Sequence, residues 1–324
     1  EISACLVGSE MCIRDSYNPF HLYVKELPGW DGVDRVTPLL LRVSDNEIWL
    51  RGGRCWLRAM LSQWSGEERL HANVLTPVLI SGKQGLSKST FCRLLMPDSL
   101  RHYFIDNLNL AAGSSPEKKL VKNGLINLDE FDKIKESQQA TLKNLLQMVN
   151  VPVFRGKRLG WVNESRLASF IATTNVYQVL IDSTGSRRFL CVEVLKPISE
   201  EPLEHKQIYA QLKEELKSGA PDYLNKEEEK ALQKHNKAYY RQSLLEDVFH
   251  CCFRHPLETE KGIWLTTAEI FQVMRKFNSA ALKEVSARQL GLKLSAMGYM
   301  AKHTSFGNRY YVFNLSAEKK DASL

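Results

Sequence analysis

Residues 78–90, VLISGKQGLSKST, constrain the fold of this 324-residue chain more than any other stretch. An apolar run over residues 78–80 predicts a short buried strand, and Phe91, Leu94 and Leu95 follow at the spacing of a helix. A glycine-bearing turn between a strand and a helix aims backbone N–H groups and the positive helix end at one point. The sequence therefore predicts an α/β domain with an anion-binding loop. The alternative is a glycine turn that caps an ordinary helix.

This loop carries the residue types that bind nucleotide phosphates. Lys88 is placed to reach the β- and γ-phosphates of ATP, and the Ser89 hydroxyl to ligate Mg²⁺. Such loops have glycine immediately before the lysine, where this chain has Ser87, and this departure puts the nucleotide affinity in question. The residues expected to surround the nucleotide are Gly82, Lys83, Gln84, Gly85, Leu86, Ser87, Lys88, Ser89 and Thr90.

Two later apolar runs end in polar side chains, as strands do at the ligand-binding edge of a parallel sheet. Residues 125–128 precede Asp129 and Glu130. We expect Asp129 to hold the Mg²⁺ shell and Glu130 to polarise the attacking water. Residues 170–174 precede Asn175, which is a candidate to orient that water. The acidic pair has a simpler interpretation as the start of an exposed helix, because further charged residues follow it.

Arg187 and Arg188 follow a turn containing glycine and serine. An arginine at this point is a candidate finger, which would neutralise charge on the transferred phosphoryl group. Solvated arginines are the alternative. Because such fingers often act across a subunit boundary, the pair predicts a homo-oligomer in the form of a ring. Each of these four features is weak evidence alone. Their order along the chain, which is loop, acidic strand, asparagine strand and arginines, strengthens the interpretation of each as part of a nucleotide site.

Together these motifs resemble the virulence-associated E family of P-loop ATPases, found mainly in phages and bacterial mobile elements. The resemblance covers residues 17–194, and Ser87 is its chief departure. It implies a relative of superfamily III helicases that uses ATP and Mg²⁺, acts on single-stranded or forked DNA, and often follows a primase module. The matching segments are residues 17–20, 30–33, 82–85, 88–90, 128–130, 173–175 and 185–189.

Residues 151–166 predict a hairpin with a basic tip. In superfamily III helicases the hairpin in this position enters the central channel and touches DNA. The resemblance therefore implies that Arg155, Lys157 and Arg158 contact phosphates and that Trp161 stacks a base. A solvated hairpin with a buried tryptophan is the alternative.

The remaining segments differ in charge and periodicity. Residues 17–73 predict a helical N-terminal part, residues 74–197 the ATPase core, and residues 198–243 a charged helical connector with a solvated face. Residues 244–315 predict three helices and a hairpin, which is the order of a winged-helix-like domain, and residues 316–324 form a tail.

The winged-helix-like domain carries several candidate DNA contacts. Arg288 and Lys293 would face a groove, while Lys302, His303 and Arg309 would lie on the wing. A net charge of +7 is compatible with an acidic polymer as partner. A domain used for protein contacts or oligomer packing is the alternative.

Composition predicts a soluble cytoplasmic protein, with no apolar run of membrane-spanning length. Residues 1–16 resemble a translated sequencing adapter and lack the layout of a leader, so we exclude them from the fold and expect further upstream domains in the natural chain. The predicted function is ATP-driven DNA unwinding in the replication of a phage or mobile element. An ATP-switched DNA-binding regulator and a catalytically weak structural ATPase are the alternatives. ATP-dependent strand displacement would separate the DNA-unwinding function from both alternatives.

Overall fold

A computed structural model describes residues 18–315, apart from residues 68, 112, 157–158, 182–185, 241–243, 258, 280–281, 283–285 and 305–306. The suspected adapter segment, Lys157, Arg158 and the tail therefore lie outside the described residues. The chain divides into two compact units, Glu1–Tyr240 and Arg241–Leu324. Within the described part of the chain, no helix combines the length and the apolar character needed to cross a membrane.

The first unit is built on a five-stranded parallel sheet with the order β2-β3-β6-β1-β7. All side chains of β1, β3 and β6 are buried, as expected of a parallel sheet covered on both faces. The predicted α/β core is confirmed. The strands are β1 (Thr76–Ile80), β2 (Phe104–Asp106), β3 (Leu125–Leu128), β6 (Ser169–Thr174) and β7 (Phe189–Glu193).

Helices cover the sheet through two hydrophobic clusters, one on each face. Leu79 and Ile171 belong to the first cluster, whereas their neighbours Val78, Phe170 and Ala172 belong to the second, because successive side chains of a strand point to opposite faces. The first cluster includes α2 (Pro19–Lys25), α3 (Val36–Leu41), α4 (Glu47–Trp64), α5 (Lys88–Leu94), α8 (His205–Lys217) and α9 (Lys226–Asn236). The second includes α6 (Glu117–Leu120), α7 (Glu136–Gln147) and strand β4 (Asn150–Phe154).

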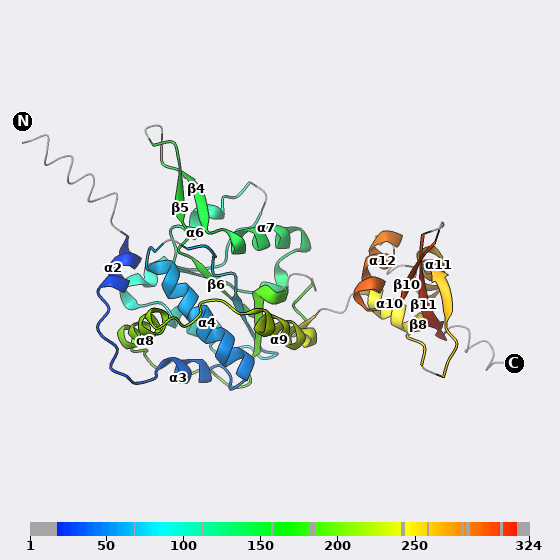
Figure 1. The fold of residues 1–324 in the computed structure, drawn as a ribbon, viewed down its shortest axis with the longest axis horizontal. Coiled ribbons are helices and arrows are strands. Elements are labelled where there is room, and N and C mark those ends of the chain that lie inside the picture. The colour runs from blue at the N-terminus through cyan, green and yellow to red at the C-terminus, as the bar shows by residue number, and fades with distance from the viewer. Residues whose placement is uncertain are drawn as a thin grey trace, which may run out of the picture. The chain divides into compact units, whose positions relative to one another are not determined.

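The described part of the first unit also contains four short 3₁₀ helices and a two-stranded hairpin. The hairpin pairs β4 with β5 (Trp161–Ser165) and projects from the body of the unit (Figure 1). The 3₁₀ helices are η1 (Asp98–Tyr103), η2 (Phe131–Lys133), η3 (Ser186–Arg188) and η4 (Lys237–Tyr239).

The segment expected to be a solvated connector instead forms part of the core. Ile208, Tyr209 and Leu212 of α8 and Leu232 of α9 are at most 4% exposed and pack in the cluster around α4. Both helices are amphipathic, and their apolar stripes face this cluster. The expectation of a solvated connector was based on their high charge content, which reflects only the face that each helix turns to solvent.

The described residues of the second unit form three α-helices and an antiparallel sheet. Strand β11 pairs antiparallel with β8, β9 and β10. Thr266 and Ser286 begin the second and third helices with reciprocal capping boxes, as their sequences indicate. The elements are α10 (Leu244–Cys252), β8 (Phe253–Arg254), β9 (Ile263–Thr266), α11 (Thr267–Phe277), α12 (Ala287–Ala296), β10 (Ala301–Thr304) and β11 (Gly307–Asn314).

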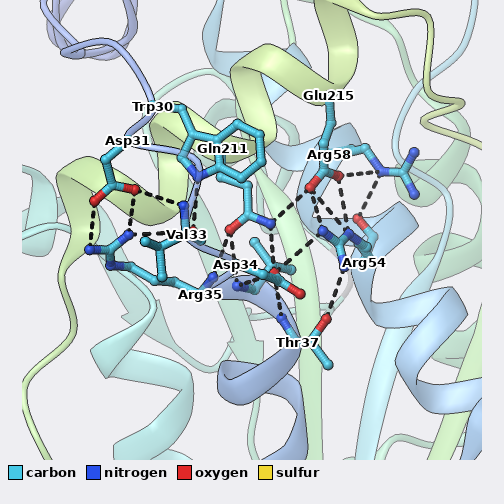
Figure 2. Close-up of polar contacts among 11 residues, drawn as sticks. Trp30, Asp31, Val33, Asp34, Arg35, Thr37, Arg54, Arg58, Gln211 and Glu215 are labelled. Carbon is cyan, nitrogen blue, oxygen red and sulfur yellow. Dashed lines mark hydrogen bonds and ion pairs between the residues drawn. The ribbon is translucent and has the colours of Figure 1, made fainter.

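A polar network ties the segment before α3 to the rest of the first unit (Figure 2). The Asp34 carboxylate accepts a hydrogen bond from Gln211 Nε2 of α8 at 2.6 Å and lies 3.4 Å from Arg54 Nη2 of α4. Arg54 Nη2 also pairs with Glu215 of α8 at 2.6 Å. One carboxylate therefore links three segments that are far apart in the sequence.

We predict that Asp34→Asn destabilises the first unit in a pH-dependent way. Burial acts to raise the pKa of Asp34, but hydrogen bonds from Gln211 and Thr37 and the Arg54 charge outweigh it and lower the pKa to about 2. The stabilisation is therefore complete above the ordinary pKa of 3.8 and lost as the pH falls through about 2. Because the side chain is 45% exposed, we expect a loss of only about 1 kcal/mol at neutral pH.

Urea unfolding of the wild type and Asp34→Asn between pH 7 and pH 2 measures this effect. The difference in unfolding free energy should shrink as the pH falls. A difference that stays constant over this range would contradict the assigned role of the charge.

Candidate active site

The predicted phosphate loop lies at the carboxyl edge of the parallel sheet. Strand β1 ends at Ile80 and α5 begins at Lys88, and β3 and β6 end at Leu128 and Thr174 on the same edge. Ligands of open α/β sheets bind outside this edge. A cavity of about 470 Å³ occupies it, lined by residues 84–90, 129–130, 132–133 and 173–176.

Lys88 lies at this edge, at the start of α5. Its Nζ donates hydrogen bonds to Ser81 Oγ at 2.5 Å and to Asn175 Oδ1 at 2.8 Å. Burial lowers the pKa of Lys88, against the opposing effect of the Asp129 charge. The structure thus brings together two predicted site residues, Lys88 and Asn175, and adds Ser81, which the sequence did not single out.

The two predicted Mg²⁺ ligands are in contact. Asp129 Oδ1 accepts a hydrogen bond from Ser89 Oγ at 3.3 Å and another from the Thr173 hydroxyl. A hydroxyl and a carboxylate that face each other are hard oxygen ligands of the kind Mg²⁺ prefers, with remaining positions for water and phosphate. The residues present therefore fit the ion.

Two further carboxylates line the cavity. Glu130 has a left-handed backbone, with φ of 52°, and its side chain is 59% exposed and pairs with Lys133 at 2.6 Å. Asp132 accepts a hydrogen bond from Thr174 Oγ1 at 2.6 Å. The sequence identified Asp132 only as one of the charged residues that follow the strand. The two threonines before Asn175 were the feature that could have indicated a hydrogen-bond partner for it.

Ser87 adopts the conformation for which the usual pattern reserves glycine. Its φ of 58° and ψ of 25° lie in the left-handed region, which costs a residue with a Cβ about 1–2 kcal/mol. The loop therefore keeps the left-handed turn with serine at this position, and the cost of replacing glycine is local backbone strain.

Tyr177 packs against Gly82 in the loop. Its hydroxyl donates to Glu193 Oε1 at 2.8 Å, and a Cβ placed on Gly82 would come within 2.9 Å of the ring. Close approach of this ring therefore favours glycine at position 82. Nothing in the local sequence indicated this contact, because Gly82 lies in the loop after β1 and Tyr177 in the loop after β6.

Arg187 and Arg188 lie at the opposite edge of the sheet. They form η3 immediately before β7, whose first residue, Phe189, pairs in parallel with Thr76 at the start of β1. Five strand residues, about 16 Å, thus separate them from the loop of their own chain. Arg187 Nη1 lies 3.4 Å from Glu229 of α9. The structure does not bring either arginine to the cavity lining.

The β4–β5 hairpin is anchored at this same amino edge by Arg166, which is 2% exposed. Burial, with repulsion from Arg69, lowers the pKa of Arg166 to about 9, which leaves it charged at neutral pH. Its bonds connect the hairpin base to the end of α7 and to the segment before β1. The guanidinium donates to the carbonyls of Asn73, Leu145, Leu146 and Ala168.

The predicted hairpin contacts have different surroundings. Arg155 forms an ion pair with Glu164, so its charge is already compensated. Trp161 is 72% exposed and is not the buried tryptophan of the alternative interpretation. Lys157 and Arg158 lie outside the described residues.

The candidate contacts of the second unit also differ. Arg288 on α12 and Lys302 on β10 are exposed, and Arg309 on β11 is half-buried. Lys293 Nζ pairs with Glu246 of α10 at 2.5 Å. Of the two candidates on α12, Arg288 is therefore the one that faces water.

Comparisons relate both units to known domains. The family model described as the virulence-associated protein E-like domain matches residues 24–241, and one described as a domain of unknown function from a B. Theta gene matches residues 242–312. The apo structure of the NrS-1 C-terminal region is similar at 14% identity and a TM-score of 0.44, covering 91% of this chain and 78% of that one. The A form of the same apo region is 15% identical in sequence, with a TM-score of 0.43 and the same coverage. No curated protein matches the sequence.

We predict that Ser87→Gly stabilises the first unit by roughly 0.5–1 kcal/mol. Glycine relieves left-handed strain of about 1–2 kcal/mol but loses about 0.5–1 kcal/mol through its freer unfolded chain. Chemical denaturation measures the change, and nucleotide affinity should be unchanged or higher. Ser87→Ala is the matched control, because it removes the hydroxyl and keeps the strained Cβ. A large loss of nucleotide affinity in Ser87→Gly would show that serine has a role beyond conformation.

Proposed function

Because the chain belongs to the virulence-associated protein E-like family, we propose that it is an ATP-hydrolysing, helicase-like enzyme for replication of a phage or mobile element. The observation that carries the proposal is the meeting of Lys88, Asn175, Ser89 and Asp129 at one edge of a parallel sheet. They come from three strand ends, and together they match what phosphoryl transfer requires.

The cavity accounts for binding of the phosphates. Backbone N–H groups of the loop would face the phosphate oxygens, and Lys88 would exchange Ser81 and Asn175 for the β- and γ-phosphates. Ser89 and Asp129 would hold Mg²⁺, which neutralises charge on the phosphates when bound. Asn175, released from the ammonium, is then able to orient a water beside the γ-phosphate.

Glu130 is proposed to polarise that water, with Asp132 as a neighbouring carboxylate. Glu130 is exposed at the cavity and its pairing with Lys133 is solvent-accessible, so the carboxylate is free to reorient at little cost. Asp132 is held by Thr174, which suits a positioning role. Comparing the two amides, Glu130→Gln and Asp132→Asn, therefore separates the two assignments.

The arginines support an assembly of several copies. Since Arg187 and Arg188 lie about 16 Å of strand away from their own loop, a finger role requires the loop of a neighbouring copy. A ring, in which each copy completes the site of the next, satisfies this requirement. We propose DNA as the polymer on which the ring acts, and a primase module upstream in a longer chain.

Strain at Ser87 favours one further candidate, a nucleotide-binding switch with weak hydrolysis. A strained loop lowers affinity or turnover without removing the fold. ATP turnover without strand displacement would support this candidate over the helicase.

We predict that Lys88→Ala abolishes ATP hydrolysis, because no other cation lines the phosphate side of the described cavity except the exposed Lys133. Glu130→Gln should bind ATP normally and reduce turnover by at least about 100-fold, whereas Asp132→Asn should lose less. Phosphate release and equilibrium binding of a labelled nucleotide measure the two effects, with strand displacement of a forked DNA as the test of unwinding. Turnover in Lys88→Ala equal to that of the wild type would overturn the site assignment.

We predict that Arg188→Ala and Lys88→Ala, each inactive alone, regain turnover when mixed. Random assembly leaves about a quarter of the interfaces with an intact loop facing intact arginines. Arg187→Ala in place of Arg188→Ala identifies which arginine acts. Absence of recovery, together with a monomeric mass at saturating ATP, would exclude the trans arrangement.

A further inference from the structure

The phosphate loop is held at its two ends, and its middle faces solvent. Ser81 Oγ donates a hydrogen bond to the Lys83 carbonyl at 2.6 Å, and the Leu86 carbonyl accepts one from the Ile198 N–H at 3.2 Å. Residues 82–85 between these ends are exposed. A loop binds phosphate only when its N–H groups point to one place, so a contact that fixes the exposed middle is expected to control binding.

The ring of Tyr177 makes such a contact. A Cβ placed on Gly82 would lie 2.9 Å from Cε2 and 3.5 Å from Oη of Tyr177, and its three nearest neighbouring atoms all belong to this side chain. Gly82 is not among the glycines with positive φ. A side chain at position 82 is therefore opposed by the ring and not by the backbone conformation.

The hydroxyl end of the ring is fixed to the neighbouring strand. Tyr177 Oη donates to Glu193 Oε1 at 2.8 Å, and a hydrogen bond to a carboxylate is stronger than one between neutral groups. Glu193 ends β7 and pairs with Ile80, which ends β1. The Val194 N–H also donates to the Ile80 carbonyl at 2.7 Å. The ring thus connects the loop to the strand beside the one from which the loop emerges.

The backbone that carries the ring is held on both sides. Before the ring, the Val176 N–H donates to Thr174 Oγ1 at 3.1 Å. After it, the N–H groups of Val179 and Leu180 donate to the Tyr239 carbonyl at 2.9 and 3.0 Å. A side chain supported in this way can hold another group in a defined position.

We propose that Tyr177 is a positioning residue for phosphoryl transfer, which holds the phosphate loop at Gly82 in the conformation that receives the phosphates. The inference rests on the proposed function and deepens it. Asn175, the candidate for orienting the water, lies two residues before Tyr177 and bonds to Lys88. One segment therefore places both the loop and the water. Because a displacement of about 1 Å can cost about 100-fold in rate, loss of the ring should affect binding and turnover together.

A purely structural role for the ring makes a different prediction. Tyr177 is 44% exposed, so it contributes little to the buried core. Its removal should leave the unfolding midpoint in urea unchanged and act on the nucleotide alone. A residue that only stabilised the fold would show the reverse.

Tyr177→Ala in the full chain tests this role. Equilibrium binding of labelled ATP with Mg²⁺ should weaken about 10-fold, and kcat for phosphate release should fall by about 10- to 100-fold. Tyr177→Phe keeps the ring on Gly82 and should lose less in both measurements. Tyr223→Ala, at a 62% exposed tyrosine between α8 and α9, is the matched control and should match the wild type.

A double-mutant cycle tests the contact itself. Gly82→Ala places a methyl group against the ring and should weaken ATP binding about 5- to 10-fold. In Tyr177→Ala the methyl group has room, so adding Gly82→Ala should cost at most about twofold more. Similarly, Glu193→Ala and Tyr177→Phe remove the same hydrogen bond, and together they should be no worse than the weaker single variant.

Two results would overturn the positioning role while the wild type binds and hydrolyses ATP. One is additive effects of Tyr177→Ala and Gly82→Ala on ATP affinity, since the ring would then not act through the loop. The other is wild-type affinity and kcat in Tyr177→Ala with a lower unfolding midpoint, which would make the contact purely structural. A wild type that neither binds nor hydrolyses ATP would instead overturn the proposed function, and the positioning role with it.

Discussion

Parallel pairing of β1 with β6 and β7 is the constraint on which the placement of every candidate residue depends. Strands that run in one direction bring their carboxyl ends to one edge, where Lys88, Asp129 and Asn175 converge although up to 87 positions separate them. The same constraint sends the arginines and the hairpin to the other edge. The candidate phosphate-binding residues and the candidate contacts with other molecules therefore lie at opposite ends of the strands of one sheet.

Two elements join these edges. Strand β6 runs from the hairpin base toward Asn175. Helix α7 runs from Glu136, three residues after the cavity-lining Lys133, to the Leu145 and Leu146 carbonyls that accept hydrogen bonds from Arg166. A buried guanidinium is costly unless its hydrogen bonds are satisfied, and here four carbonyls from three segments accept them. Arg166 thus fixes the hairpin base to the carboxyl end of α7.

Backbone strain is concentrated at the cavity. Ser87 and Glu130 are two of the three described residues other than glycine with positive φ, and both border the candidate phosphate site. Strained conformations persist where the surrounding structure enforces them, and they cluster at functional sites. The serine that departs from the usual loop pattern and the proposed catalytic carboxylate therefore share one physical property.

The sequence by itself determined the strand–loop–helix, the acidic and asparagine strand ends and the capping boxes, because each depends on residues that are neighbours in the chain. Only the tertiary structure decided which residues become partners. Asp132 pairs with Thr174, the Tyr177 ring packs over Gly82, and Arg155 pairs with Glu164. It also showed that α8 and α9 are core helices. Local pattern sets the backbone and its polarity, whereas charge compensation, burial and the edge on which an arginine lies depend on how distant segments pack.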